Sequence, residues 1–110
     1  MLNRSLILGL LLTTSLLSAQ SAFAPRPPLD IPLVLSGTFA ELRGNHFHGG
    51  IDIKTQGRSG LKIYSVAAGY VSRIAVNPYG YGNALYLRHP EGYTTVYGHL
   101  NAFYPELEAW

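Results

Sequence analysis

Residues 61–100 read LKIYSVAAGY VSRIAVNPYG YGNALYLRHP EGYTTVYGHL, and the spacing of turns along them determines the fold class that we predict. Short runs rich in β-branched and aromatic residues alternate with Gly- and Pro-rich turns at residues 77–82 and 90–92. The runs that we interpret as strands are residues 61–66, 69–76, 83–89 and 93–100. Short strands about ten residues apart, separated by such turns, are typical of antiparallel sandwiches and barrels. The sequence therefore predicts an all-β fold.

The residues before this stretch have the same character. Residues 34–39 are short and β-prone, and residues 51–54 alternate apolar and polar side chains. Turns are expected at residues 45–50 and 57–60, where Gly is frequent. Residues 25–32 hold four prolines, so we interpret them as an extended linker or an edge segment.

The last residues differ from the rest of the chain. Pro105 is followed by Glu106 and Glu108, which places a proline and two acidic groups where a helix begins. The sequence therefore predicts the start of a helix at the C-terminus.

Composition excludes several classes of protein. The chain has 110 residues, enough for one domain at most. Eight basic residues against six acidic ones give a net charge of +2, too small for the concentrated basic face of a nucleic-acid binder. With no Cys, disulfides, thiolate zinc sites, cysteine nucleophiles and a lipid-anchored cysteine are all excluded.

The first 24 residues have the order of a secretory signal peptide. A polar, weakly basic start with Arg4 precedes an apolar run over residues 6–17 and then small residues. The run is shorter than the ~20 residues of a membrane span, so a retained anchor is the weaker interpretation. Cleavage is expected after Ala24, with Ala19 as second choice. We therefore expect export to the periplasm, cell envelope or exterior, and a thin core in the remaining residues.

The candidate chemistry lies in His48-Gly49-Gly50-Ile51-Asp52. Imidazole nitrogen and carboxylate oxygen are ligands that zinc accepts. On a straight strand these two side chains would lie ~13 Å apart, but the glycine pair allows a bend that brings them together. The alternative is a surface turn with a capping Asp, which is the more common meaning of an isolated H-x-x-x-D.

Four blocks together resemble the lysostaphin/LytM-type zinc metalloendopeptidases of peptidase family M23. The blocks are NHFHGGIDIK at residues 45–54, VAAGYV at 66–71, GYGNAL at 80–85 and TTVYGHL at 94–100. The resemblance implies a Gly-rich antiparallel β-sandwich of the duplicated hybrid motif type, in a partial peptidase domain over residues 33–110. It also implies a Zn²⁺ cofactor, and peptidoglycan as the substrate whose peptide cross-links are cleaved.

Residue by residue, His48 and Asp52 match the family's first and second zinc ligands. His99 matches a histidine that lines the active site and stabilises the transition state or moves a proton. Period-two alternation supports this by placing His99 on one face of a strand with Thr95 and Tyr97. A histidine on such a face suits an acid, a base or a donor to developing charge.

The sequence departs from the family at the motif that closes the site. The family has an H-x-H there, which supplies the third zinc ligand and the catalytic base, but no His follows His99. His46-Phe47-His48 has the H-x-H pattern, but it lies in the wrong place because it includes His48, the residue that matches the first zinc ligand. Since catalytic zinc normally has three protein ligands, we expect the chain to be a truncated domain that is inactive alone.

Two further functions stay open. One is an inactive relative that binds cell wall or activates a partner hydrolase. The other is a cytoplasmic phosphocarrier or biotinyl-type domain, which the export signal disfavours. For the remaining side chains we expect His46 to be a turn residue rather than a support for the ligands, Asn45 to hydrogen-bond within the turn, and His89 to be an exposed strand end. Five tyrosines are candidates for a substrate-binding wall or for ordinary half-buried strand positions: Tyr79, Tyr81, Tyr86, Tyr93 and Tyr97.

Overall fold

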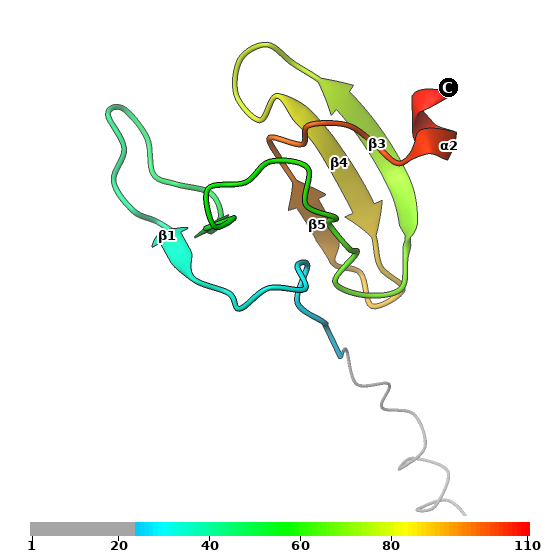
Figure 1. Cartoon of the computed structure of the whole chain (residues 1–110), viewed down its shortest axis with the longest axis horizontal. Coiled ribbons are helices and arrows are strands. Elements are labelled where there is room, and N and C mark those ends of the chain that lie inside the picture. Colours follow the sequence, from blue (N-terminus) through cyan, green and yellow to red (C-terminus); the bar gives the residue numbers. More distant parts are fainter. Residues whose placement is uncertain (1–23) are drawn as a thin grey trace, which may run out of the picture.

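The computed structural model describes residues 24–110, so residues 1–23 of the expected signal peptide lie outside it. The described elements are β1 (Leu35–Gly37), β2 (Asp52–Ile53), β3 (Tyr70–Val76), β4 (Asn83–Arg88), β5 (Thr94–Tyr97) and α2 (Pro105–Glu108) (Figure 1). The prediction of an antiparallel all-β fold with a short C-terminal helix is confirmed. Between residues 24 and 110, no helix has the length and apolar character needed to cross a bilayer.

The larger sheet has the antiparallel order β3-β4-β5. Leu85 in β4 lies opposite Ile74 of β3 and Tyr97 of β5. Strand β3 lies at the edge of this sheet, and its apolar side chains are largely in contact with solvent. The exposed ones are Tyr70, Val71, Ile74 and Val76.

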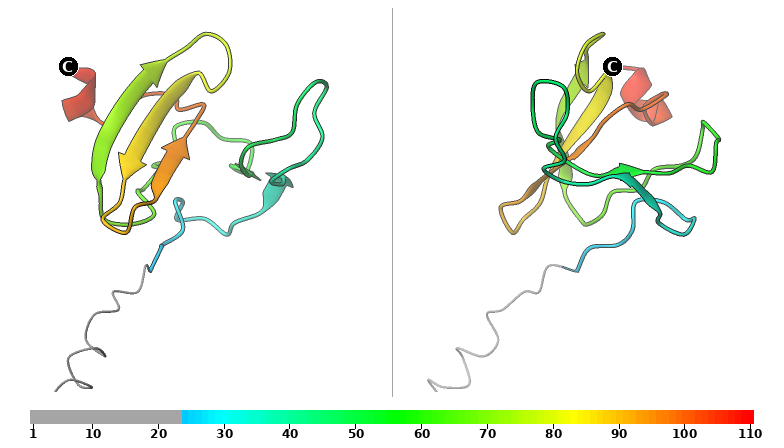
Figure 2. Two further views of the ribbon diagram at one scale, coloured as in Figure 1. Left: turned by 180° about the vertical axis from the view of Figure 1, so that it is seen from behind. Right: turned by 90° about the vertical axis from the view of Figure 1, so that its left-hand side faces the viewer.

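The smaller sheet pairs β1 with β2 and carries the candidate ligands. Gly37 lies opposite Asp52, and the hairpin between the strands has a second pairing of Leu42 with Phe47. Figure 2 shows this hairpin projecting away from the three-stranded sheet. The pairing brings residues 37–43 alongside residues 47–52, which places upstream side chains next to Asp52.

The strand predicted over residues 61–66 is wrong. These residues run beside the proline-rich segment, and only isolated bonds join the two: Arg26 donates its backbone N–H to Val66 O at 2.7 Å, and Tyr64 donates to Pro28 O at 2.8 Å. Proline has no N–H to donate, so a continuous ladder cannot form here. Residues 25–32 are thus joined to residues 64–66 by these two hydrogen bonds. Leu29, within this proline-rich segment, is buried.

The core is thin, as expected for a small chain. Among the described residues the buried apolar side chains are Leu29, Ala84 and Leu87. His89 is also buried, with 3% of its surface exposed, so the prediction of an exposed strand end is wrong. Its ring nitrogens bond to Ala68 O and to Thr95 Oγ1, each at 2.8 Å. Ala68 is 21 residues away in the sequence, and Thr95 lies in strand β5. The sequence around His89 therefore does not reveal these hydrogen bonds.

Candidate metal centre

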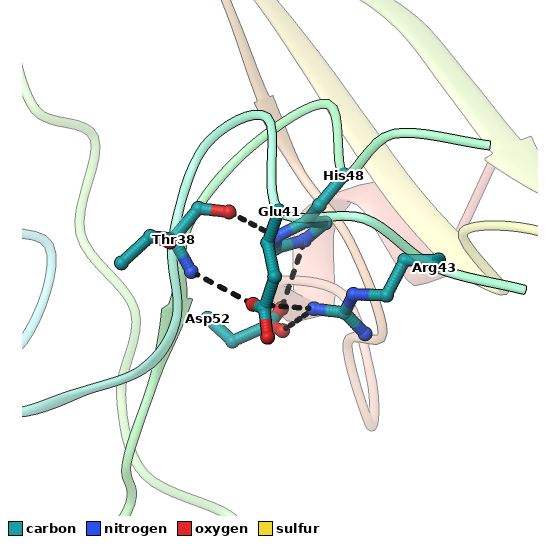
Figure 3. A network of polar contacts seen from close by, with 5 residues as sticks. All are labelled: Thr38, Glu41, Arg43, His48 and Asp52. Carbon is teal, nitrogen blue, oxygen red and sulfur yellow. Dashed lines mark hydrogen bonds and ion pairs between the residues drawn. The ribbon is translucent and has the colours of Figure 1, made fainter.

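His48 and Asp52 lie in contact at the base of the β1–β2 hairpin (Figure 3). Nε2 of His48 is 3.3 Å from Oδ1 of Asp52. His48 is placed by hairpin bonds, because its N–H donates to Glu41 O and its carbonyl accepts from Ala40 N, each at 2.8 Å. The structure thus brings the two predicted ligands together.

Gly49 and Gly50 do not form the tight bend that was expected to bring His48 and Asp52 together. Neither Gly49 nor Gly50 has a positive φ, whereas Ala40 does, at 63°. At Gly49, a Cβ would lie 3.4 Å from the hydroxyl of Tyr81. Gly49 therefore leaves room for this tyrosine beside His48.

The hydrogen bonding of His48 aims a lone pair at Asp52. Nδ1 is 3.0 Å from the carbonyl oxygen of Thr38, and since a carbonyl only accepts, Nδ1 carries the proton. In the neutral imidazole, Nε2 is then an acceptor that faces the Asp52 carboxylate. Two facing acceptors require a cation between them, either a proton or a metal ion.

The distance between the two acceptors fits zinc. Two ligand atoms each ~2.0–2.1 Å from a tetrahedral ion lie ~3.3 Å apart, which is the observed separation of His48 Nε2 and Asp52 Oδ1. Histidine ligands almost always donate their other ring N–H to a carbonyl or carboxylate, as His48 does to Thr38. Donor types, spacing and orientation therefore all suit a zinc ligand pair.

Arg43 binds the other oxygen of Asp52. Its Nη2 lies 2.8 Å from Asp52 Oδ2 and 3.6 Å from Glu41 Oε2. This hydrogen bond is the main cause that holds the pKa of Asp52 below its usual range. The charges of His48, Arg43 and His99 lower this pKa further, while desolvation raises it. The Asp52 carboxyl group is therefore ionised at neutral pH.

Both candidate ligands can be reached from solvent. The Asp52 side chain is 42% exposed and that of His48 is 18% exposed. The two side chains therefore lie at the surface, where an ion can reach them from solvent.

His99 lies just beyond the end of β5, so the alternation used to place it on a strand face is wrong. Its φ is 55°, in the left-handed region. It is held there by backbone bonds, because its own N–H donates to Tyr81 O at 2.7 Å and the next residue, Leu100, donates to Asn83 O at 3.0 Å. The His99 charge is one of those that lower the pKa of Asp52, so the imidazole is close enough to act on the site electrostatically.

No third ligand joins the pair within residues 24–110, where no group of three His, Asp or Glu side chains is placed to hold a metal ion. His46 is an exposed turn residue whose Nδ1 lies 2.7 Å from Asn45 Oδ1. This matches the expectation of a turn histidine and of an Asn that bonds within the turn.

The tyrosines divide into two groups. Tyr79 and Tyr93 are highly exposed, and Tyr81 is half exposed. Tyr97 is not part of a wall, because its hydroxyl accepts from Val66 N and lies 3.0 Å from Thr95 Oγ1. Tyr86 packs under the guanidinium of Arg73.

Sequence reasoning missed Thr38, Glu41 and Arg43. A signal existed for Arg43, which is the only Arg or Lys between residues 27 and 53 and lies among acidic residues. Its partner is nine positions away and is brought close only by the β1–β2 pairing.

Comparison with known proteins gives one match. The model of the family described as peptidase family M23 matches residues 46–108, more than half of the chain, and this range includes His48, Asp52 and His99. No curated protein and no solved structure gave a match.

Proposed function

This chain belongs to peptidase family M23, and from that premise we propose that it is a zinc-dependent endopeptidase domain that acts on the peptide cross-links of peptidoglycan. The observation that carries the proposal is the pairing of His48 Nε2 with Asp52 Oδ1 at 3.3 Å. This pair has the chemistry and the spacing of two zinc ligands.

His48 and Asp52 would hold the ion, and Thr38 would orient the imidazole through its carbonyl oxygen. Zinc bound there would polarise the scissile carbonyl and lower the pKa of a bound water. Because no H-x-H follows His99, these 110 residues provide two of the three ligands of the family. We propose that they are inactive alone for this reason.

His99 would act on the substrate rather than on the metal. The backbone of residues 81–83 fixes it, and an imidazole can donate a hydrogen bond to a developing oxyanion or pass a proton to the leaving amine. Its left-handed backbone is consistent with a residue held for function rather than by strand pairing.

Peptidoglycan as substrate rests on the family resemblance and on the position of the candidate ligand pair at the surface, where both side chains are partly exposed. Export rests on the order of polar, apolar and small residues at positions 1–24. Outside the cytoplasm the chain would meet peptidoglycan directly.

The test is to extend the chain with an H-x-H block of the family and to incubate it with zinc and purified peptidoglycan. We expect the extended chain to release peptides with new free amino groups, detected by mass spectrometry. The 110-residue chain should release no such peptides. An extended chain that binds zinc but releases no peptide would overturn the proposal. Binding to peptidoglycan without cleavage would instead favour the inactive cell-wall module.

A further inference from the structure

We infer that Arg43 is a positioning residue that holds Oδ2 of Asp52, so that only Oδ1 is presented to a metal ion beside His48. The inference rests on the proposed zinc function. Arg43 lies outside residues 46–108, the range matched by the family model.

The geometry divides the two oxygens of Asp52 between two partners. Arg43 Nη2 lies 2.8 Å from Oδ2, and His48 Nε2 lies 3.3 Å from Oδ1 (Figure 3). A carboxylate with both oxygens free can bind an ion through one or both, or turn away from it. One fixed guanidinium bond removes these alternatives and leaves a single oxygen for the ion.

Arg43 is itself held in place by Glu41, and Glu41 in turn by Thr38, both in the first half of the hairpin. Its Nη2 lies 3.6 Å from Glu41 Oε2, and that oxygen accepts from the backbone N–H of Thr38 at 3.2 Å. The carbonyl of Thr38 accepts from His48 Nδ1. Thr38 therefore supports both ligands, one directly and the other through Glu41 and Arg43.

Gly37 provides the space for this arrangement. A Cβ at Gly37 would collide with Asp52 Oδ2 and would lie 2.8 Å from Arg43 Nη2. The ion pair thus packs directly against the backbone of β1, where any larger residue would displace it.

Removal of Arg43 should change zinc affinity in opposite directions, depending on whether its charge or its positioning of Asp52 matters more. A guanidinium repels a nearby dication, so removal of its charge alone should tighten zinc binding. If Arg43 instead positions Asp52, its removal should weaken binding, since loss of a residue that orients a ligand typically costs ~10–100-fold in metal affinity. The sign of the change separates the two roles.

The experiment is a zinc titration of the full chain followed by NMR, with Arg43→Gln, Arg43→Lys and the control Arg58→Gln. Arg58 is exposed, and its guanidinium donates to Gln56 Oε1 at 2.8 Å, away from the candidate ligands. We expect Arg43→Gln to bind zinc ~10–100-fold more weakly, Arg43→Lys to fall between it and the parent because Lys lacks the rigid fork, and Arg58→Gln to match the parent. Unchanged or tighter binding by Arg43→Gln would overturn the inference.

A second measurement needs no metal. Three-bond couplings of the Asp52 side chain report whether it keeps one χ1 rotamer, and the backbone spectrum reports whether the variant is folded. We expect one rotamer in the parent and averaged rotamers in Arg43→Gln. A parent that binds no zinc would contradict the proposed function but leave this measurement valid, and a single rotamer retained in Arg43→Gln would contradict the role of Arg43.

Discussion

The backbone N–H of His99 donates to the carbonyl oxygen of Tyr81 at 2.7 Å. Tyr81 also lies against Gly98, where a Cβ would be 3.4 Å from its ring, and its hydroxyl reaches the same distance from a Cβ at Gly49. One tyrosine therefore lies between the two histidine-containing motifs, which are about fifty residues apart in the sequence. This contact explains how His99 keeps a left-handed backbone, which costs ~1–3 kcal/mol unless its surroundings hold it.

His48→Ala should remove zinc binding by the chain. It takes away the nitrogen that faces Asp52 and leaves a single carboxylate, which holds zinc poorly. Isothermal titration calorimetry measures the loss, and His46→Ala is the matched control because His46 is exposed and bonds only within its turn. Equal zinc affinity in His48→Ala and the parent would show that the ligand assignment is wrong.

Stability should fall in acid because of Asp52. Its pKa is lower in the folded chain than in the unfolded chain, so its contribution is present above the unfolded value of ~3.9 and is lost as pH falls through the folded value. Urea unfolding at a series of pH values should show this loss in the parent and not in Asp52→Asn. Arg43→Gln should raise the pKa of Asp52 toward the ordinary value, as followed by carboxyl NMR, and Arg58→Gln should leave it unchanged.

Gly37→Ala should weaken zinc binding while leaving the fold intact. The added Cβ displaces the ends of two partly exposed side chains, Asp52 and Arg43, rather than backbone. We expect a loss of at least ~10-fold in zinc affinity, comparable to other losses of ligand orientation. Gly44→Ala is the control, because its Cβ would enter open space. Similar zinc affinities in the two variants would argue against the tight packing of the ion pair on β1.

His89→Leu should destabilise the chain by ~1–3 kcal/mol. The change leaves Ala68 O and Thr95 Oγ1 without their buried partner, which carries a desolvation cost of that size. The free energy of unfolding in urea measures it, with His46→Ala expected within ~0.5 kcal/mol of the parent. A loss no larger than that of the control would mean that the buried hydrogen bonds contribute little.

The 110-residue chain should show no hydrolysis of peptidoglycan, since it has two candidate zinc ligands and no assigned base. In the chain extended with H-x-H, replacing His99 by Ala should reduce the rate by ~10²–10⁴, the usual contribution of a general acid or base. Release of free amino groups gives both rates. Zinc-dependent cleavage by the 110-residue chain would show that His46 or a ligand from a second copy completes the site.

Much of the sheet could be predicted from the sequence because its strands are local patterns bounded by Gly and Pro. The predicted runs over residues 69–76 and 83–89 contain β3 and β4. The run over residues 61–66 is no strand because its neighbour is rich in proline, a property of the partner rather than of the run. His89 was predicted wrongly for a similar reason, since its hydrogen-bond partners Ala68 and Thr95 are not its neighbours in the sequence.

The candidate ligands could be found because His48 and Asp52 are close in sequence and match a known motif. Arg43 could not, because it reaches Asp52 only through the pairing of β1 with β2. The alternation of residues along a strand could not predict the left-handed backbone of His99 either. That conformation depends on hydrogen bonds to the backbone of residues 81–83.

The exposed edge strand β3 bears on how copies of the chain behave in concentrated solution. An outer strand with apolar side chains and unpaired backbone groups is a template for joining other strands. Arg73 is the only charged residue in β3, and single charges of this kind oppose aggregation. We therefore expect Arg73 to limit the joining of copies along β3, a strand that contributes no ligand to the candidate metal centre.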